Sequence, residues 1–177
     1  APRYQPITAA EIPEVTLTAE HCAAPPTPRG TGPAEDASAV ANAAGTVRII
    51  AGEMDGVVGP AKTFSPVELW DVSLPDVARA TVISLPEGHT VILFVRRGSL
   101  GVGEEGSEQT VGAQGVALLG GDGRSVRLAA QEPDTQVLLL GGQPLNEPIA
   151  AQGPFVMNTR QELLQANMDF QEGRMGR

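Results

Sequence analysis

The sequence predicts a mainly β fold of the sandwich or barrel type, with one α-helix near its C-terminal end. Short runs rich in Val, Ile and Leu recur between residues 81 and 140, and turns carrying Gly, Pro, Asp or Ser separate them. Strands that recur roughly every 8–12 residues are typical of β-sandwiches and β-barrels. These folds also protect strand edges from pairing with other chains. The predicted strands of this stretch are residues 81–85, 91–96, 99–103, 115–119, 125–129 and 136–140.

The chain before this stretch supplies further strands and one long connection. Residues 1–18 alternate weakly between apolar and polar, which predicts an extended arm ending in an edge strand at 14–18. Residues 19–46 are rich in Pro, Ala, Gly, Ser and Thr, a composition that buries little apolar surface and predicts a mobile loop. A buried strand is expected at 47–51.

Residues 67–72 alternate with period two and predict a half-buried strand. The single tryptophan, Trp70, falls on the polar side of this alternation. Aromatic side chains more often pack than stack on ligands, so we expect Trp70 in the core or at its rim rather than in a ligand site.

A helix is predicted to begin after Thr159. The side chain of Thr159 can accept from the backbone N–H of Glu162, whose carboxylate can reach back, which is the pattern of a capping box. Leu163, Ala166 and Phe170 then fall on one helical face, and a glycine at 173 can end the helix.

Composition excludes several classes of function. The net charge of −9 argues against a protein that binds nucleic acid directly through phosphates. No apolar run reaches the roughly 18 residues of a transmembrane helix, and residues 1–6 lack the pattern of a signal peptide. The single cysteine, Cys22, excludes an internal disulfide and fits a reducing compartment. We expect it to be a loop residue, with a redox-sensitive thiol as the alternative.

Residues 142–173 resemble the C-terminal signature of the pirin family. Earlier stretches agree, since residues 2–5 are similar to the join between the two pirin domains, and 47–51 to the opening of the second. The matching segments of the signature are Gln143-Pro144-Leu145, Glu147-Pro148, Gly153-Pro154-Phe155-Val156-Met157-Asn158-Thr159, Gln165-Ala166 and Asp169-Phe170.

This resemblance implies a bicupin, with two β-barrel domains in one chain closed by a C-terminal helix. It covers only the latter part of a pirin, so the N-terminal cupin would lie outside this sequence. The fold expected here is a cupin-type double-stranded β-helix (jelly-roll barrel) with a C-terminal α-helix. The expected organisation is an inter-domain arm at 1–18, a flexible loop at 19–46, a metal-free barrel at 47–141, and the signature loop and helix at 142–177.

The cupin metal motifs lack their donors here. When the first motif is anchored on Gly98, its glutamate position holds Val91 and its histidines fall near Leu85 and Glu87. When the second is anchored on Gly115, its histidine position holds Val126. Valine and leucine donate nothing to Fe(II), Mn or Zn, so we expect no metal, catalytic or cofactor residue in this chain.

The remaining candidates for a site are weak. Of two histidines, His21 falls in the predicted loop and His89 is expected at a turn or rim, because one imidazole cannot hold a metal alone. Gly101-Val102-Gly103 predicts a hairpin rather than a dinucleotide fingerprint, and 120–124 predicts a tight turn rather than a phosphate cradle. Adjacent Glu104 and Glu105 are expected in a solvated turn.

Three hypotheses of function remain open. The first is the structural C-terminal cupin of a pirin-like protein. The resemblance then implies Fe(II) in the N-terminal cupin and either quercetin 2,3-dioxygenase-like activity or redox-dependent transcriptional co-regulation through protein partners. The second is a stand-alone, metal-free cupin that binds a small ligand or a protein at its barrel mouth. The third is an inert fragment left by proteolysis.

The sequence also gives expectations about binding partners and cellular location. An orphaned half-molecule would expose an apolar face, so we expect pairing with the missing N-terminal cupin or with a second copy of the chain. Direct contact with nucleic acid or membrane is not expected. The expected location is cytoplasmic, or also nuclear if the source is a eukaryote.

Overall fold

A computed structural model describes residues 5–17, 43–77 and 79–175. The chain divides into two compact units: a barrel unit of residues Ile7–Gln143, and a C-terminal unit of the residues from Pro144 on, to which Gln5 and Pro6 also belong. Most of the predicted loop at 19–46 lies outside the described residues. Its last residues, Gly45 and Thr46, already belong to a strand, which therefore begins earlier than expected.

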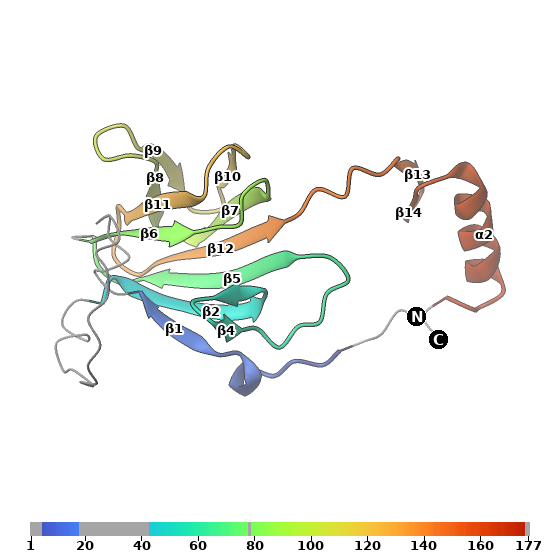
Figure 1. Ribbon diagram of the computed structural model, residues 1–177, viewed down its shortest axis with the longest axis horizontal. Coiled ribbons are helices and arrows are strands. Elements are labelled where there is room, and N and C mark those ends of the chain that lie inside the picture. The colour runs from blue at the N-terminus through green and yellow to red at the C-terminus, as the bar shows by residue number, and fades with distance from the viewer. Residues whose placement is uncertain (1–4, 18–42, 78, 176–177) are drawn as a thin grey trace. The chain divides into compact units, whose positions relative to one another are not determined.

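The larger sheet of the barrel unit has six antiparallel strands in the order β1-β2-β5-β12-β7-β10. Figure 1 shows β1, β2, β5 and β12 side by side in this layer. Strands distant in sequence become neighbours here, because β12 lies between β5 and β7. The strands are β1 Glu14–Leu17, β2 Gly45–Ala51, β5 Val67–Leu74, β7 Thr90–Arg97, β10 Val116–Leu119 and β12 Thr135–Gly142.

The smaller sheet has four strands in the order β6-β11-β8-β9. These are β6 Ala80–Ser84, β8 Ser99–Val102, β9 Gln109–Gly112 and β11 Ser125–Ala130. Strand β9 was not predicted, because its residues carry no apolar run and most are exposed. Two further short strands that the sequence did not indicate, β3 Glu53–Met54 and β4 Val57–Val58, pair with each other.

The core lies between the two sheets. One buried cluster contains side chains from both, among them Ile49, Leu93 and Leu139 of the larger sheet and Leu100 and Leu128 of the smaller. Burial alternates along the strands, as in the buried-intermediate repeat of β2. The predicted two-layer β architecture is confirmed.

Trp70 lies in this core. Its side chain is 1% exposed, and its indole Nε1 donates to the backbone oxygen of Ala51 at 3.1 Å. The prediction of core packing is confirmed, but the face of β5 was misjudged. The side that carries Glu68 and Trp70 is buried, while Leu69 and Asp71 are only partly covered.

The C-terminal unit pairs a hairpin with a helix. Strands β13 Ala150–Gln152 and β14 Phe155–Met157 form the hairpin, and helix α2 spans Arg160–Gln171. Leu163 and Ala166 of α2 are buried, as predicted, and the ring of Phe170 meets that of Phe155 edge-on at 5.8 Å between centroids. No helix within the described ranges has both the length and the apolar character needed to cross a bilayer.

Both ends of α2 follow from local chemistry. Glu162 N donates to Thr159 Oγ1 at 3.2 Å, and Thr159 N donates to Glu162 Oε2 at 2.9 Å, so the predicted capping box is confirmed. At the other end Gly173 has φ +67°, and the N–H groups of Gly173 and Arg174 donate to the carbonyls of Phe170 and Asp169. This is a Schellman motif, in which glycine takes the left-handed position.

The core packing predicts that truncating an inward-facing leucine destabilises the fold far more than truncating an outward-facing one. Leu139→Ala deletes a side chain with no exposed surface and should lower the free energy of unfolding by about 2–5 kcal/mol, because burial is lost and a cavity remains. The matched control is Leu118→Ala, whose side chain is 71% exposed. Urea unfolding followed by Trp70 fluorescence measures both. Equal losses in the two variants would contradict the assignment of the core.

Candidate functional site

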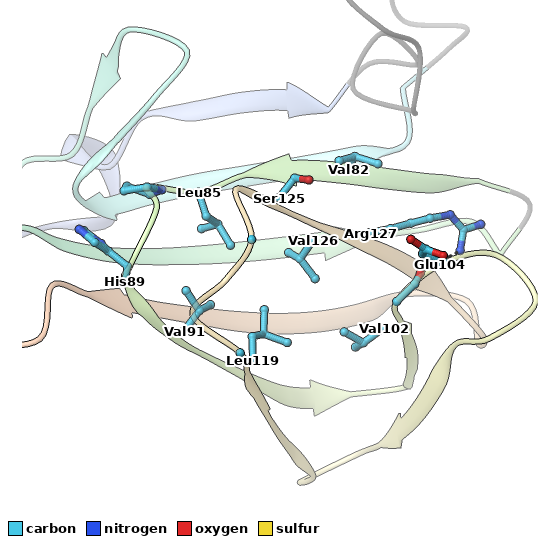
Figure 2. A pocket seen from close by; sticks show the side chains of 14 residues that line it. Val82, Leu85, His89, Val91, Val102, Glu104, Leu119, Ser125, Val126 and Arg127 are labelled. Carbon is cyan, nitrogen blue, oxygen red and sulfur yellow. Dashed lines mark hydrogen bonds between the residues drawn. The ribbon is translucent and has the colours of Figure 1, made fainter.

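The barrel unit contains a cavity of about 730 Å³ between its two sheets. Its walls are mostly apolar, and Figure 2 shows side chains from opposite sheets pointing toward one another within it. The apolar side chains at its centre are Leu85, Val91, Val102, Leu119 and Val126.

The structure brings together the positions that the cupin motifs identify. Leu85, Val91 and Val126 all line this cavity, although they lie on a loop and two different sheets. Glu87 is not part of the lining, and its largely exposed carboxylate pairs with Arg124. Within the described ranges, no group of three or more His, Cys, Asp or Glu side chains converges as metal ligands do. The donor set around Val91 and Val126 therefore does not fit an iron ion.

His89 lies at one end of the cavity, and its side chain is mostly buried. Its Nδ1 is 2.8 Å from Oε2 of Glu68, and the two side chains are 9% and 7% exposed. The backbone N–H of His89 donates to the carbonyl of Pro86 at 3.4 Å, so the residue closes a turn, as expected. The sequence around His89 and around Glu68 gave no sign, however, that the Glu68 carboxylate would contact this imidazole.

The sheet register explains how Glu68 reaches His89. Gly141 of β12 pairs with Glu68 on one side and with Val91 of β7 on the other. A Cβ at Gly141 would lie 2.6 Å from Oε2 of Glu68, so the absence of a side chain leaves the carboxylate room across β12. His89 immediately precedes β7 and lies within its reach.

The opposite end of the cavity carries one guanidinium and two nearby carboxylates. Arg127 and Glu104 belong to the lining, and Nη1 of Arg127 donates to Oε1 of Glu108 at 2.6 Å. The pKa of Glu108 lies below its ordinary value, mainly because its carboxylate accepts from its own backbone N–H, and next because it accepts from Arg127. A second, weaker contact joins Arg127 to the carbonyl of Gly103 at 3.5 Å.

The other predicted motifs are turns, as expected. Gly101-Val102-Gly103 ends β8 and opens its hairpin with β9, with no helix after it. Residues 120–124 connect β10 to β11, and Glu104 and Glu105 are exposed. The predictions for His21 and Cys22 lie outside the described residues.

The larger sheet also carries an exposed apolar patch on its outer face, named here the outer patch. It consists of Ile92 on β7, Leu140 on β12, and Val116 and Leu118 on β10, which are 36%, 37%, 60% and 71% exposed. Leu118, Ile92 and Leu140 stand directly side by side in the sheet register. A polar pair, Arg96 with Asp71, lies on the same sheet.

Comparison with known families gives one assignment. Residues 69–176 match the pirin C-terminal cupin domain. The match covers more than half of the chain and runs from within β5 through α2.

Individual relatives agree with this assignment. A Pseudomonas aeruginosa protein provisionally named a quercetin 2,3-dioxygenase is 39% identical over 173 residues, which are 98% of this chain and 50% of that protein. Mouse pirin is 30% identical over 177 residues, which are 99% of this chain and 52% of pirin. The crystal structure of quercetin 2,3-dioxygenase from Acinetobacter baumannii matches with a TM-score of 0.75 at 36% identity, over 98% of this chain and 51% of that one. The chain therefore spans about half the length of the relatives it matches.

The low pKa of Glu108 predicts a pH-dependent contribution to stability. A carboxyl whose folded pKa lies below its ordinary 4.5 stabilises the fold fully above that value, and the contribution is lost as the pH falls through the folded pKa. Glu108→Gln should therefore unfold at lower urea than wild type at neutral pH, and the gap should close in acid. The control is the exposed Glu105→Gln. A gap that persists in acid, or an equal gap in the control, would contradict this role.

Proposed function

The chain belongs to the pirin family, and we propose that it is the structural cupin domain of a bicupin whose metal-dependent chemistry resides in the other cupin. The observation that carries this proposal is the outer patch. Four exposed aliphatic side chains on three neighbouring strands form a surface that an isolated domain would not keep uncovered without a function.

The interior supports a structural role. The positions that a metal-bearing cupin would use for donors hold Val91, Val126 and Leu85, and their apolar side chains line the cavity. Iron(II) needs imidazole and carboxylate ligands, so we assign Fe(II) to the N-terminal cupin of the whole protein. In this account the reaction named for the relatives, dioxygenation of quercetin, belongs to that cupin as well. Redox-dependent co-regulation through protein partners is its alternative activity.

The length of the relatives supports one particular occupant of the outer patch. The curated relatives cited above are about twice as long as the chain, so each contains a second portion of similar size. A second cupin of the same protein would stay near this face at high effective concentration because it is covalently linked. We therefore propose that the N-terminal cupin, rather than an unrelated protein, covers the patch.

The composition of the patch fits a domain interface. Leu118, Ile92 and Leu140 form an apolar row, and the Arg96–Asp71 ion pair supplies polar groups on the same sheet. An apolar centre with a polar rim is the usual arrangement of a specific interface. Strand β10 is also an edge strand, which a docked domain would shield from other chains.

Leu118→Asp tests this role by placing a carboxylate in the outer patch. The proposed N-terminal cupin, produced as a separate chain, should bind the wild-type chain and bind the variant more weakly by about tenfold or more. The reason is that docking would bury an unpaired charge. Isothermal titration calorimetry measures both affinities.

The matched control is Val58→Asp, because Val58 is 63% exposed on β4 and lies outside the patch. Its affinity should equal that of wild type. Equal affinities for all three chains, an absence of association, or an encoded protein without a second cupin would each overturn the proposal.

A further inference from the structure

The cavity between the sheets has the size and walls of a small-molecule site. Its volume of about 730 Å³ lies within the roughly 300–1,000 Å³ that is usual for ligand pockets. Its apolar walls come from both sheets, with Val91 and Leu119 on the larger and Val102 and Val126 on the smaller. A hydrocarbon chain in this space would exchange water for apolar side chains, which favours binding. The docking role proposed above makes no use of this space.

One carboxylate of the lining has no partner among the described residues. Glu104 lies in the exposed turn between β8 and β9, and Figure 2 shows its side chain at the same end of the cavity as Arg127, away from His89. Within the described ranges, the hydrogen bonds of Glu104 are made by its backbone oxygen, which accepts from the N–H and the hydroxyl of Ser107. The carboxylate is therefore available to a ligand.

The other charged groups around the cavity are already paired. Arg127 is the one arginine or lysine among the described lining residues, and it donates to Glu108 at 2.6 Å and to the carbonyl of Gly103 at 3.5 Å. At the far end, the carboxylate of Glu68 contacts His89 at 2.8 Å. A ligand thus meets one available charge, which is negative. The net charge of −9 also favours the approach of cations over that of anions.

We propose that this cavity binds an aliphatic amine, whose ammonium group pairs with Glu104 and whose hydrocarbon chain lies between Val91 and Val126. Among ligands of equal chain length, an ammonium ion is attracted by Glu104, an alcohol is not, and a carboxylate is repelled. Because Glu104 is exposed, the ion pair adds a modest preference, and the apolar walls supply most of the affinity. The site goes beyond the structural role and does not depend on it, since the outer patch lies on the outer face of the sheet.

The probes are octylamine, 1-octanol and octanoate, which share one hydrocarbon chain and differ in charge at neutral pH. Titrations followed by NMR of the protein should show saturable binding of octylamine at a single site. Octylamine should bind more tightly than 1-octanol by about twofold to fivefold, the effect of one exposed ion pair, and octanoate should bind most weakly.

Glu104→Gln tests the ion pair, because it removes the charge and keeps the shape of the side chain. In this variant the preference for octylamine over 1-octanol should vanish, while the affinity for 1-octanol should equal that of wild type. The matched control is Glu105→Gln, since Glu105 is the next residue, is also exposed and does not line the cavity. Its preference should equal that of wild type, which separates a contact with Glu104 from the attraction of the net charge.

A second pair of variants locates the hydrocarbon chain of the ligand. Leu119 of β10 lines the cavity, whereas its neighbour Leu118 belongs to the outer patch. Leu119→Ala should weaken the binding of octylamine and 1-octanol alike by about fourfold or more, the effect of losing the contact of one buried methylene. Leu118→Ala should leave both affinities unchanged.

Any of the following results would overturn the proposal: an absence of saturable octylamine binding, a preference for the amine that persists in Glu104→Gln, an equal loss of preference in Glu105→Gln, or affinities that Leu119→Ala leaves unaltered. Each can occur whether or not Leu118→Asp weakens domain association. Failure of the amine site and failure of the structural role are therefore distinguishable.

Discussion

The apolar contact between the two sheets determines both how the barrel is stabilised and which ligands its interior can hold. Leu93, Val95, Val137 and Leu139 of the larger sheet have no exposed side-chain surface and close one side of the core. Near the mouth the same packing continues with Val91 and Val126. A metal site would need imidazole and carboxylate groups at those positions, and unligated polar groups buried there would destabilise the fold. The valines therefore stabilise the barrel and exclude the donor set together.

Much of this fold could be predicted, because its signals are local. Apolar runs bounded by turn residues located β2, β7 and β12, and the Thr159 capping box located the start of α2. Strand β9 escaped prediction because its residues are mostly exposed and gain their structure from pairing with β8. Alternation also failed to say which face of β5 is buried, since a glutamate on the inward side looks like a sign of exposure.

For the candidate site, the sequence predicted only that the usual cupin metal-ligand positions hold apolar residues. His89 and Glu68 are 21 residues apart in sequence and meet because Gly141 lies between their strands without a side chain. That relation depends on the register of three strands, which no single stretch of sequence contains. The outer patch was expected in kind, but its residues could be named only once β10 was known to pair with β7.

The central proposal is that this cavity holds no iron and that Fe(II) binds in the other cupin of the whole protein. The most direct measurement is anomalous diffraction at the iron K edge, on crystals of the full-length protein loaded with Fe(II). The account predicts an anomalous peak in the N-terminal cupin and none between Val91 and Val126. An ordered iron peak inside this barrel would contradict it.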